Sequence, residues 1–79
     1  MKEIILDSEK DVVIQKQQTM KASKVLVGSF IDSEKDQTVT AILAIPNKIQ
    51  FNLLLWEGDN YNPDWTQQQA YDRIQELLQ

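Results

Sequence analysis

Apolar residues occupy every second position in two stretches of the sequence that a short polar segment joins. Side chains that alternate with a period of two belong to a β-strand with one buried face. Between the stretches, Pro46 cannot donate to a strand ladder and Asn47 tolerates a left-handed backbone, so we expect a turn there. A connection this short favours antiparallel neighbours. The alternating positions are Val39, Ala41, Leu43 and Ile45, followed by Ile49, Phe51, Leu53 and Leu55.

Other runs rich in β-branched residues extend this expected sheet. Gly28 lies within one of them and predicts a β-bulge or a close approach of another backbone segment. The word DSEKD occurs twice, each time between two apolar runs, and we expect both copies to be hairpin loops in which Asp and Ser bond to the turn backbone. The copies lie at 7–11 and 32–36, and the expected strands at about 3–6, 11–20, 24–31, 37–45 and 49–57.

A helix is predicted at about 66–78. Thr66 is a suitable N-cap, and Gln69 three residues later completes a capping box. An earlier start, with Asn62 as the cap, is the alternative that we consider less suitable. The apolar positions that recur at helical spacing on one face are Ala70, Tyr71, Ile74, Leu77 and Leu78.

The end of the last expected strand indicates where this helix packs. Leu54 and Trp56 make the strand apolar on its second face as well, so another element has to cover that face. We therefore predict a single α+β domain over residues 1–79. It consists of an antiparallel meander of about five strands with the C-terminal helix packed on the sheet.

The composition excludes several classes of chemistry. The 79 residues include no cysteine and no histidine, which excludes thiol nucleophiles, imidazole acid–base steps and the usual structural zinc sites. No glycine-rich phosphate loop is present, and the acidic segment near residue 60 lacks the ligand spacing of a calcium loop. We expect no cofactor and no metal.

The net charge and the lengths of the apolar runs argue against nucleic acids and membranes as partners. A net charge of −4 and a single arginine, Arg73, argue against binding to a nucleic-acid backbone. The longest apolar runs, 41–45 and 53–56, are far shorter than the roughly 20 residues that span a membrane. The start of the chain does not resemble a signal peptide. We expect a soluble, cytoplasmic protein with no membrane contact.

The segment around the two tryptophans holds the candidate site residues, namely Trp56, Glu57, Asp59, Tyr61 and Trp65. One interpretation is that the three aromatic residues form a ligand platform for a sugar, a peptide or a cation. The interpretation that we favour is that they clasp the helix to the sheet. Glu57 and Asp59 share a strand parity, as paired catalytic carboxylates would. However, so small a chain cannot easily build the deep cleft that such an enzyme needs.

We therefore expect a small non-catalytic protein that acts through protein–protein contacts of its sheet. It would work as a homo-oligomer or as an accessory part of a larger assembly. The first alternative is a small ligand-binding module that uses Trp56, Tyr61 and Trp65. The second alternative is an enzyme based on the carboxylates Glu57 and Asp59.

Overall fold

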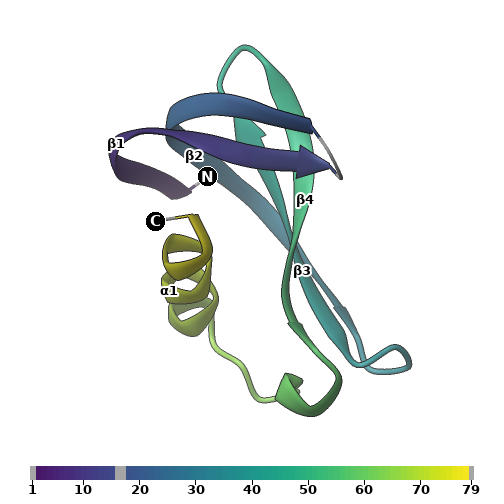
Figure 1. Ribbon diagram of the computed structural model, residues 1–79. Helices are drawn as coiled ribbons and strands as arrows, with labels where there is room; N and C mark the ends of the chain where they lie inside the picture. The colour runs from purple at the N-terminus through teal and green to yellow at the C-terminus, as the bar shows by residue number, and fades with distance from the viewer. Residues whose placement is uncertain (1, 16–17, 79) are drawn as a thin grey trace.

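The computed structural model describes residues 2–15 and 18–78. It contains one antiparallel sheet with the strand order β1-β2-β3-β4, followed by a C-terminal helix (Figure 1). The α+β meander predicted from the sequence is confirmed, with four strands in place of about five. The elements are β1 (Lys2–Gln15), β2 (Gln18–Ser33), β3 (Thr38–Ile45), β4 (Ile49–Glu57), the 3₁₀ turn η1 (Gly58–Asn60) and α1 (Gln67–Leu78).

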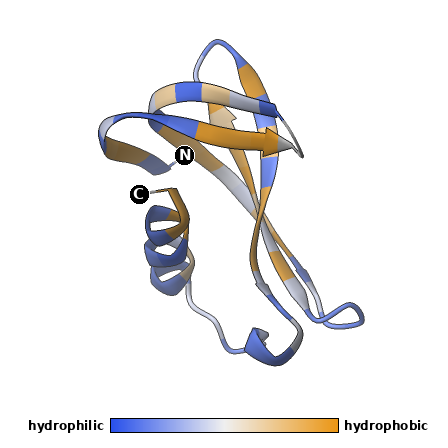
Figure 2. Cartoon of the chain, viewed as in Figure 1, coloured by the Kyte–Doolittle hydropathy of each residue, from blue (hydrophilic) through white to orange (hydrophobic). Residues whose placement is uncertain are grey.

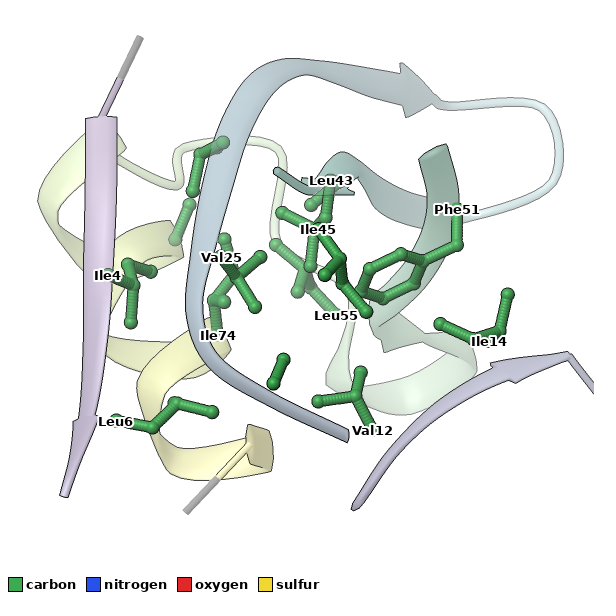
Figure 3. Close-up of a cluster of buried hydrophobic side chains, with 14 of the residues drawn as sticks. Ile4, Leu6, Val12, Ile14, Val25, Leu43, Ile45, Phe51, Leu55 and Ile74 are labelled. Atoms are coloured by element: carbon green, nitrogen blue, oxygen red, sulfur yellow. The ribbon is translucent and has the colours of Figure 1, made fainter. Parts of the chain in front are cut away.

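The sheet curls around a single core, and α1 lies on the inner side of the curve, where it contacts β1 and β4 (Figure 1). Figure 3 shows how the buried side chains of the strands and the helix meet there. Each fully buried aliphatic side chain contributes roughly 1.5–3 kcal/mol relative to an exposed one. The core residues are Ile4, Leu6, Val12, Ile14, Ala22, Val25, Val27, Val39, Ala41, Leu43, Ile45, Phe51, Leu55, Ala70 and Ile74.

Strand β3 follows the predicted alternation along its whole length. The four apolar positions of one parity are buried, and the four residues of the other parity are half-buried on the outer side. Figure 2 shows apolar stretches along the strands and mostly hydrophilic residues on α1. The inner face of the sheet is therefore the core side, and the outer face meets solvent.

Two β-bulges change which side chains point inward. Gly28 is an extra residue between the pairs Val27–Leu43 and Ser29–Ile42, so the predicted bulge is confirmed. A Cβ atom at Gly28 would lie 3.4 Å from the backbone oxygen of Ile42, at the edge of ordinary van der Waals contact. Leu55 is the extra residue of the second bulge, in β4. Each bulge reverses the inward parity of the strand beyond it.

The two copies of DSEKD have different structures. The copy at 32–36 ends β2 and forms the hairpin turn to β3, as predicted, and Ser33 Oγ donates to Asp36 Oδ2 at 3.2 Å. The copy at 7–11 is no hairpin loop: it lies within β1, where the pairing to β2 slips between Ile5 and Lys10. The expected strands 3–6 and 11–20 are therefore wrong as separate units. β1 contains the first and part of the second, and β2 begins at Gln18.

The helix start is confirmed at Thr66. The backbone N–H of Gln69 donates to Thr66 Oγ1 at 3.2 Å, and the Thr66 N–H donates to Gln69 Oε1 at 2.9 Å. These two bonds are the capping box that the sequence predicts. On the expected apolar face, Ala70 and Ile74 are fully buried, whereas Leu77 is 41% exposed and lies outside the core.

Candidate functional site

The candidate residues lie at the end of the sheet where β4 gives way to the helix. Trp56 is the penultimate residue of β4, Asp59 lies in η1, and Tyr61 and Trp65 belong to the connection that leads to α1. The bulge at Leu55 places Trp56 opposite Val39, whose side chain is buried. Trp56 therefore packs against the core from the helix side, as do Tyr61 and Trp65.

A carboxylate on β2 joins the two aromatic residues of the connection. The Tyr61 hydroxyl donates to Asp32 Oδ1 at 2.6 Å, and the Trp65 indole N–H donates to Asp32 Oδ2 at 2.8 Å. Both oxygens of the carboxylate thus accept hydrogen bonds from side chains about thirty residues away in the sequence. Asp32 pairs with Val39 across the sheet, which places its side chain on the inner face beside the connection.

These hydrogen bonds shift two acid–base equilibria. The bonds from Tyr61 and then Trp65 lower the pKa of the Asp32 carboxyl, because both donors stabilise its charged form. The same Asp32 bond raises the pKa of Tyr61 from 10.0 to about 12, with smaller contributions from burial and from the charges of Asp32 and Glu34.

The direction of each pKa shift fixes how stability depends on pH. Because the pKa of Asp32 is lower in the folded protein, Asp32 contributes to the free energy of unfolding above pH 3.8. This contribution is lost as the pH falls through the folded-state pKa. Because the pKa of Tyr61 is higher in the folded protein, its contribution to the free energy of unfolding is complete below pH 10.0. This contribution is lost as the pH rises through about 12.

The titration of Tyr61 tests this geometry. In a Tyr71→Phe background, Tyr61 is the only tyrosine, and its phenolate absorbance should reach half of its maximum near pH 12. Adding Asp32→Asn should bring this midpoint back towards 10. Asp36→Asn removes the same charge from the neighbouring turn and serves as the control, with a much smaller expected shift. Equal shifts for the two variants would show that charge, and not the hydrogen bond, sets the pKa.

Ring contacts complete the connection between helix and sheet. Trp65 meets Phe30 of β2 edge-on, with ring centroids 5.3 Å apart, and Phe30 also approaches Tyr71 of α1 at 5.9 Å. The rings of Trp56 and Trp65 lie 6.4 Å apart at 42°. Such aromatic pairs add about 0.5–1.5 kcal/mol beyond the area that they bury. These contacts have the arrangement of the clasp that we favour from the sequence.

One side of the two indoles remains accessible in an open cleft of about 420 Å³. The cleft lies between the end of β4, the connection and the outward side of α1. Its lining combines aromatic rings, carboxamides and charged groups. The lining residues are Trp56, Asn60, Asn62, Trp65, Gln69, Asp72, Arg73 and Glu76.

Hydrogen bonds hold the charged groups of the cleft in place. Arg73 donates through Nε to the backbone oxygen of Leu55 at 3.0 Å, and its NH1 forms an ion pair with Glu76 at 2.8 Å. Leu55 is the bulge residue of β4, so Arg73 donates to the carbonyl of a residue that has no directly paired partner on β3. Asp72 accepts from the Gln68 carboxamide at 3.0 Å.

The two acids predicted as site residues lie apart from this cleft lining. Glu57 is exposed and borders a smaller hollow of about 130 Å³, which shares Trp56, Asn60 and Arg73 with the cleft. Asp59 is exposed in η1. Within residues 2–15 and 18–78, no group of three or more acidic side chains is placed to hold a metal ion. Whether these acids act in binding or catalysis stays a prediction.

Sequence reasoning missed the residues that organise the site. Asp32 lies in the second DSEKD copy, which we interpreted only as a loop. We considered Arg73 only as the single arginine of an acidic chain, and Asn62 only as the alternative helix cap. The one available signal was a capping box next to a tryptophan, because an indole N–H at a helix start needs an acceptor.

No family model, curated protein or solved structure matches the chain in the three comparisons. In the described part of the chain, no helix has the length and apolar character needed to cross a membrane. Proposals about function therefore rest on the geometry above and on the surface of the sheet.

Proposed function

We propose that the protein is a non-catalytic interaction protein that acts through the outer face of its sheet, with a second copy of the chain as its partner. The observation that carries this proposal is an uncharged patch on the outer face, called here the outer patch. Three strands contribute three residues each, and none of the nine is buried. They are Leu26, Ser29, Ile31, Thr40, Ile42, Ala44, Gln50, Asn52 and Leu54.

The strand register builds the outer patch as three rows. Residues directly paired in an antiparallel sheet share a face. Ile31, Thr40 and Leu54 form one row, in which Ile31 is 50% and Leu54 is 42% exposed. The second row is Ser29, Ile42 and Asn52, and the third is Leu26, Ala44 and Gln50. The two most exposed apolar side chains of the patch are therefore separated only by a threonine.

The absence of charge from the outer patch supports a protein partner. A quarter of the chain is charged, yet these nine positions are uncharged. The buried centre of a protein interface is depleted in charged residues in the same way. A second copy also carries −4, so the neutral patch is where two acidic chains approach with the least repulsion. A two-fold axis would then place the same patch on both sides.

The outer patch also contains a hollow that a partner side chain fits. It measures about 210 Å³ and lies beside the bulge at Gly28, where a side chain is missing from the surface. Leu26, Ile42 and Ala44 give it an apolar lining. A chain of 79 residues buries only roughly 60% of its surface on folding, so contact with another subunit adds stability that the monomer core lacks.

Catalysis, nucleic-acid binding and membrane binding have no part in this proposal. The chain lacks thiols and imidazoles, and its single arginine is paired with Glu76 and the Leu55 carbonyl. A cytoplasmic location is part of the same proposal and stays a prediction.

Leu54→Lys tests the proposal by placing a charge at the outer patch. Sedimentation equilibrium of the natural chain should show reversible association below about 1 mM, where even −4 kcal/mol of association free energy gives dimers. Leu54→Lys should weaken that association at least tenfold, because a buried unpaired charge costs more than about 1.4 kcal/mol.

Leu77→Lys is the matched control, since Leu77 is 41% exposed but lies on α1. It introduces the same charge and removes a side chain of the same size and exposure, so association should persist. A natural chain that stays monomeric at 1 mM contradicts self-association. Equal weakening by the two variants would show that the effect comes from charge alone and not from the outer patch.

A further inference from the structure

We propose that the cleft between α1 and the end of β4 binds a neutral saccharide, with Trp56 and Trp65 as the stacking surface. The cleft volume of about 420 Å³ falls in the range of small-molecule sites, which is about 300–1,000 Å³. Such sites combine apolar rings with a few polar groups that fix the orientation of the ligand. This cleft lies on the helix side of the molecule, so the inference is independent of the outer patch.

The two indoles supply the apolar part of the site. Their planes are inclined by 42°, with centroids 6.4 Å apart, so they form a bent surface and not a closed box. The Trp65 ring is held by its edge-on contact with Phe30 and by its N–H bond to Asp32. Ring faces held in this way lose little side-chain entropy when the C–H face of a sugar ring packs on them.

The carboxamides of the cleft are oriented by bonds made elsewhere. Gln69 uses its Oε1 to accept from the Thr66 N–H, and Asn62 uses its Oδ1 to accept from the Asp64 N–H at 3.0 Å. The group that each carboxamide can offer a ligand is therefore its NH₂, a donor. Asn60, which is exposed, adds an amide that is both donor and acceptor.

The carboxylates of the cleft supply acceptors beside these donors. Asp72 and Glu76 each have lone pairs beyond the single bond that each makes. A sugar hydroxyl donates one hydrogen bond and accepts two, so neighbouring hydroxyls need donors and acceptors side by side. The cleft offers planar groups of both kinds around an aromatic surface, which is what a polyhydroxylated ring requires.

The charges argue against an organic cation as the ligand. Arg73 lines the same cleft, so an ammonium group would meet a like charge, and the Asp72 carboxylate that could attract it already accepts from Gln68. A cation also prefers several rings facing it, and Tyr61 is turned away to Asp32 instead. Glu76 is already paired with Arg73. A neutral ligand avoids both the repulsion and the competition for Glu76.

Titration with sugars, followed by NMR, tests the proposal. The probes are glucose, galactose, mannose, N-acetylglucosamine, cellobiose and lactose, added to the ¹⁵N-labelled full chain. At least one should produce saturable shifts in the tryptophan indole N–H signals and in the side-chain NH₂ signals of Asn62 or Gln69. Trp56→Leu should weaken that binding about tenfold, which corresponds to about 1.4 kcal/mol.

Two further variants keep the test decisive. Asn60→Ala changes an exposed cleft residue that the core does not need, and it should weaken binding severalfold in a fully folded chain. Gln50→Ala, in the outer patch, should leave binding unchanged. The proposal is overturned if none of the sugars gives saturable shifts up to about 50 mM, a range that would detect affinities weaker than millimolar. It is also overturned if tetramethylammonium shifts the cleft signals while the sugars do not.

Discussion

Replacing Ile74 by alanine is expected to lower the free energy of unfolding by about 3 kcal/mol, within the range of about 2–5 for such truncations. Ile74 is fully buried on α1 and belongs to the core that the strands share with the helix (Figure 3). Alanine is a better helix former than isoleucine. The loss therefore measures packing between helix and sheet, because the intrinsic helix preference changes in the opposite direction.

Leu77→Ala provides the control on the same helix. Leu77 is 41% exposed and stands outside the core, so its truncation should cost less than about 1 kcal/mol. Urea denaturation of both variants, followed by circular dichroism, gives the two free energies. Stability of small domains lies near the low end of roughly 5–15 kcal/mol, so Ile74→Ala should also lower the melting temperature visibly. Equal losses for the two variants would show that the helix does not depend on the core.

The elements that local patterns control could be predicted from the sequence. β3 and the first half of β4 follow a period of two, and both faces of β3 are as expected. The helix begins at Thr66 because the two partners of its capping box are only three residues apart. Patterns of this kind depend on neighbours in the sequence, so they can be identified without knowledge of the rest of the fold.

The two β-bulges change which side chains of β2 and β4 face the core, and the one in β4 explains why the end of that strand appeared apolar on both faces. Val25 and Val27 point inward before Gly28, and beyond that bulge Phe30 and Asp32 point inward while Ile31 points outward. In β4 the bulge at Leu55 brings Trp56 to the core side and leaves Leu54 outside, so the expected cover is present over Trp56 and wrong for Leu54, which is 42% exposed. Gly28 indicated the bulge in β2, whereas no residue of the sequence indicated the bulge in β4.

The repeated DSEKD word shows the limit of a local interpretation. In the second copy, Ser33 and Asp36 hydrogen-bond to each other and the chain reverses. In the first copy, the same five residues shift the register of β1 against β2 but do not reverse the chain. Leu6, just before this copy, is buried beside the helix. This burial indicates that core contacts keep the segment extended. Tertiary packing, and not the word itself, decides between turn and strand.

The centre of the candidate site could not be predicted for a related reason. Asp32 meets Tyr61 and Trp65 only because the register of β2, the bulge at Gly28 and the path of the connection coincide. The aromatic residues themselves were expected to matter. Their acceptor was not, because contacts between positions about thirty residues apart leave no periodic trace in a single sequence.

Replacing Trp65 by alanine is the second large change that we expect, with a loss of about 3 kcal/mol in the free energy of unfolding. The variant removes the ring that packs on Phe30 and faces Trp56, together with the N–H that donates to Asp32. Trp65 immediately precedes the Thr66 cap, so the loss should be concentrated in the docking of α1. Hydrogen exchange should show faster exchange for α1 amides, while the amides of β3 change less.

Trp65→Phe separates the ring from its hydrogen bond. Phenylalanine keeps a six-membered aromatic ring against Phe30 and loses the donor to Asp32 with the five-membered part of the indole, so its loss of stability should be clearly smaller than that of alanine. If the two variants were equally unstable, the five-membered part of the indole with its N–H, and not the six-membered ring, would hold the helix. If neither loosened α1, Trp65 would not be a clasp, and its partial exposure in the cleft would then have to be explained by ligand binding alone.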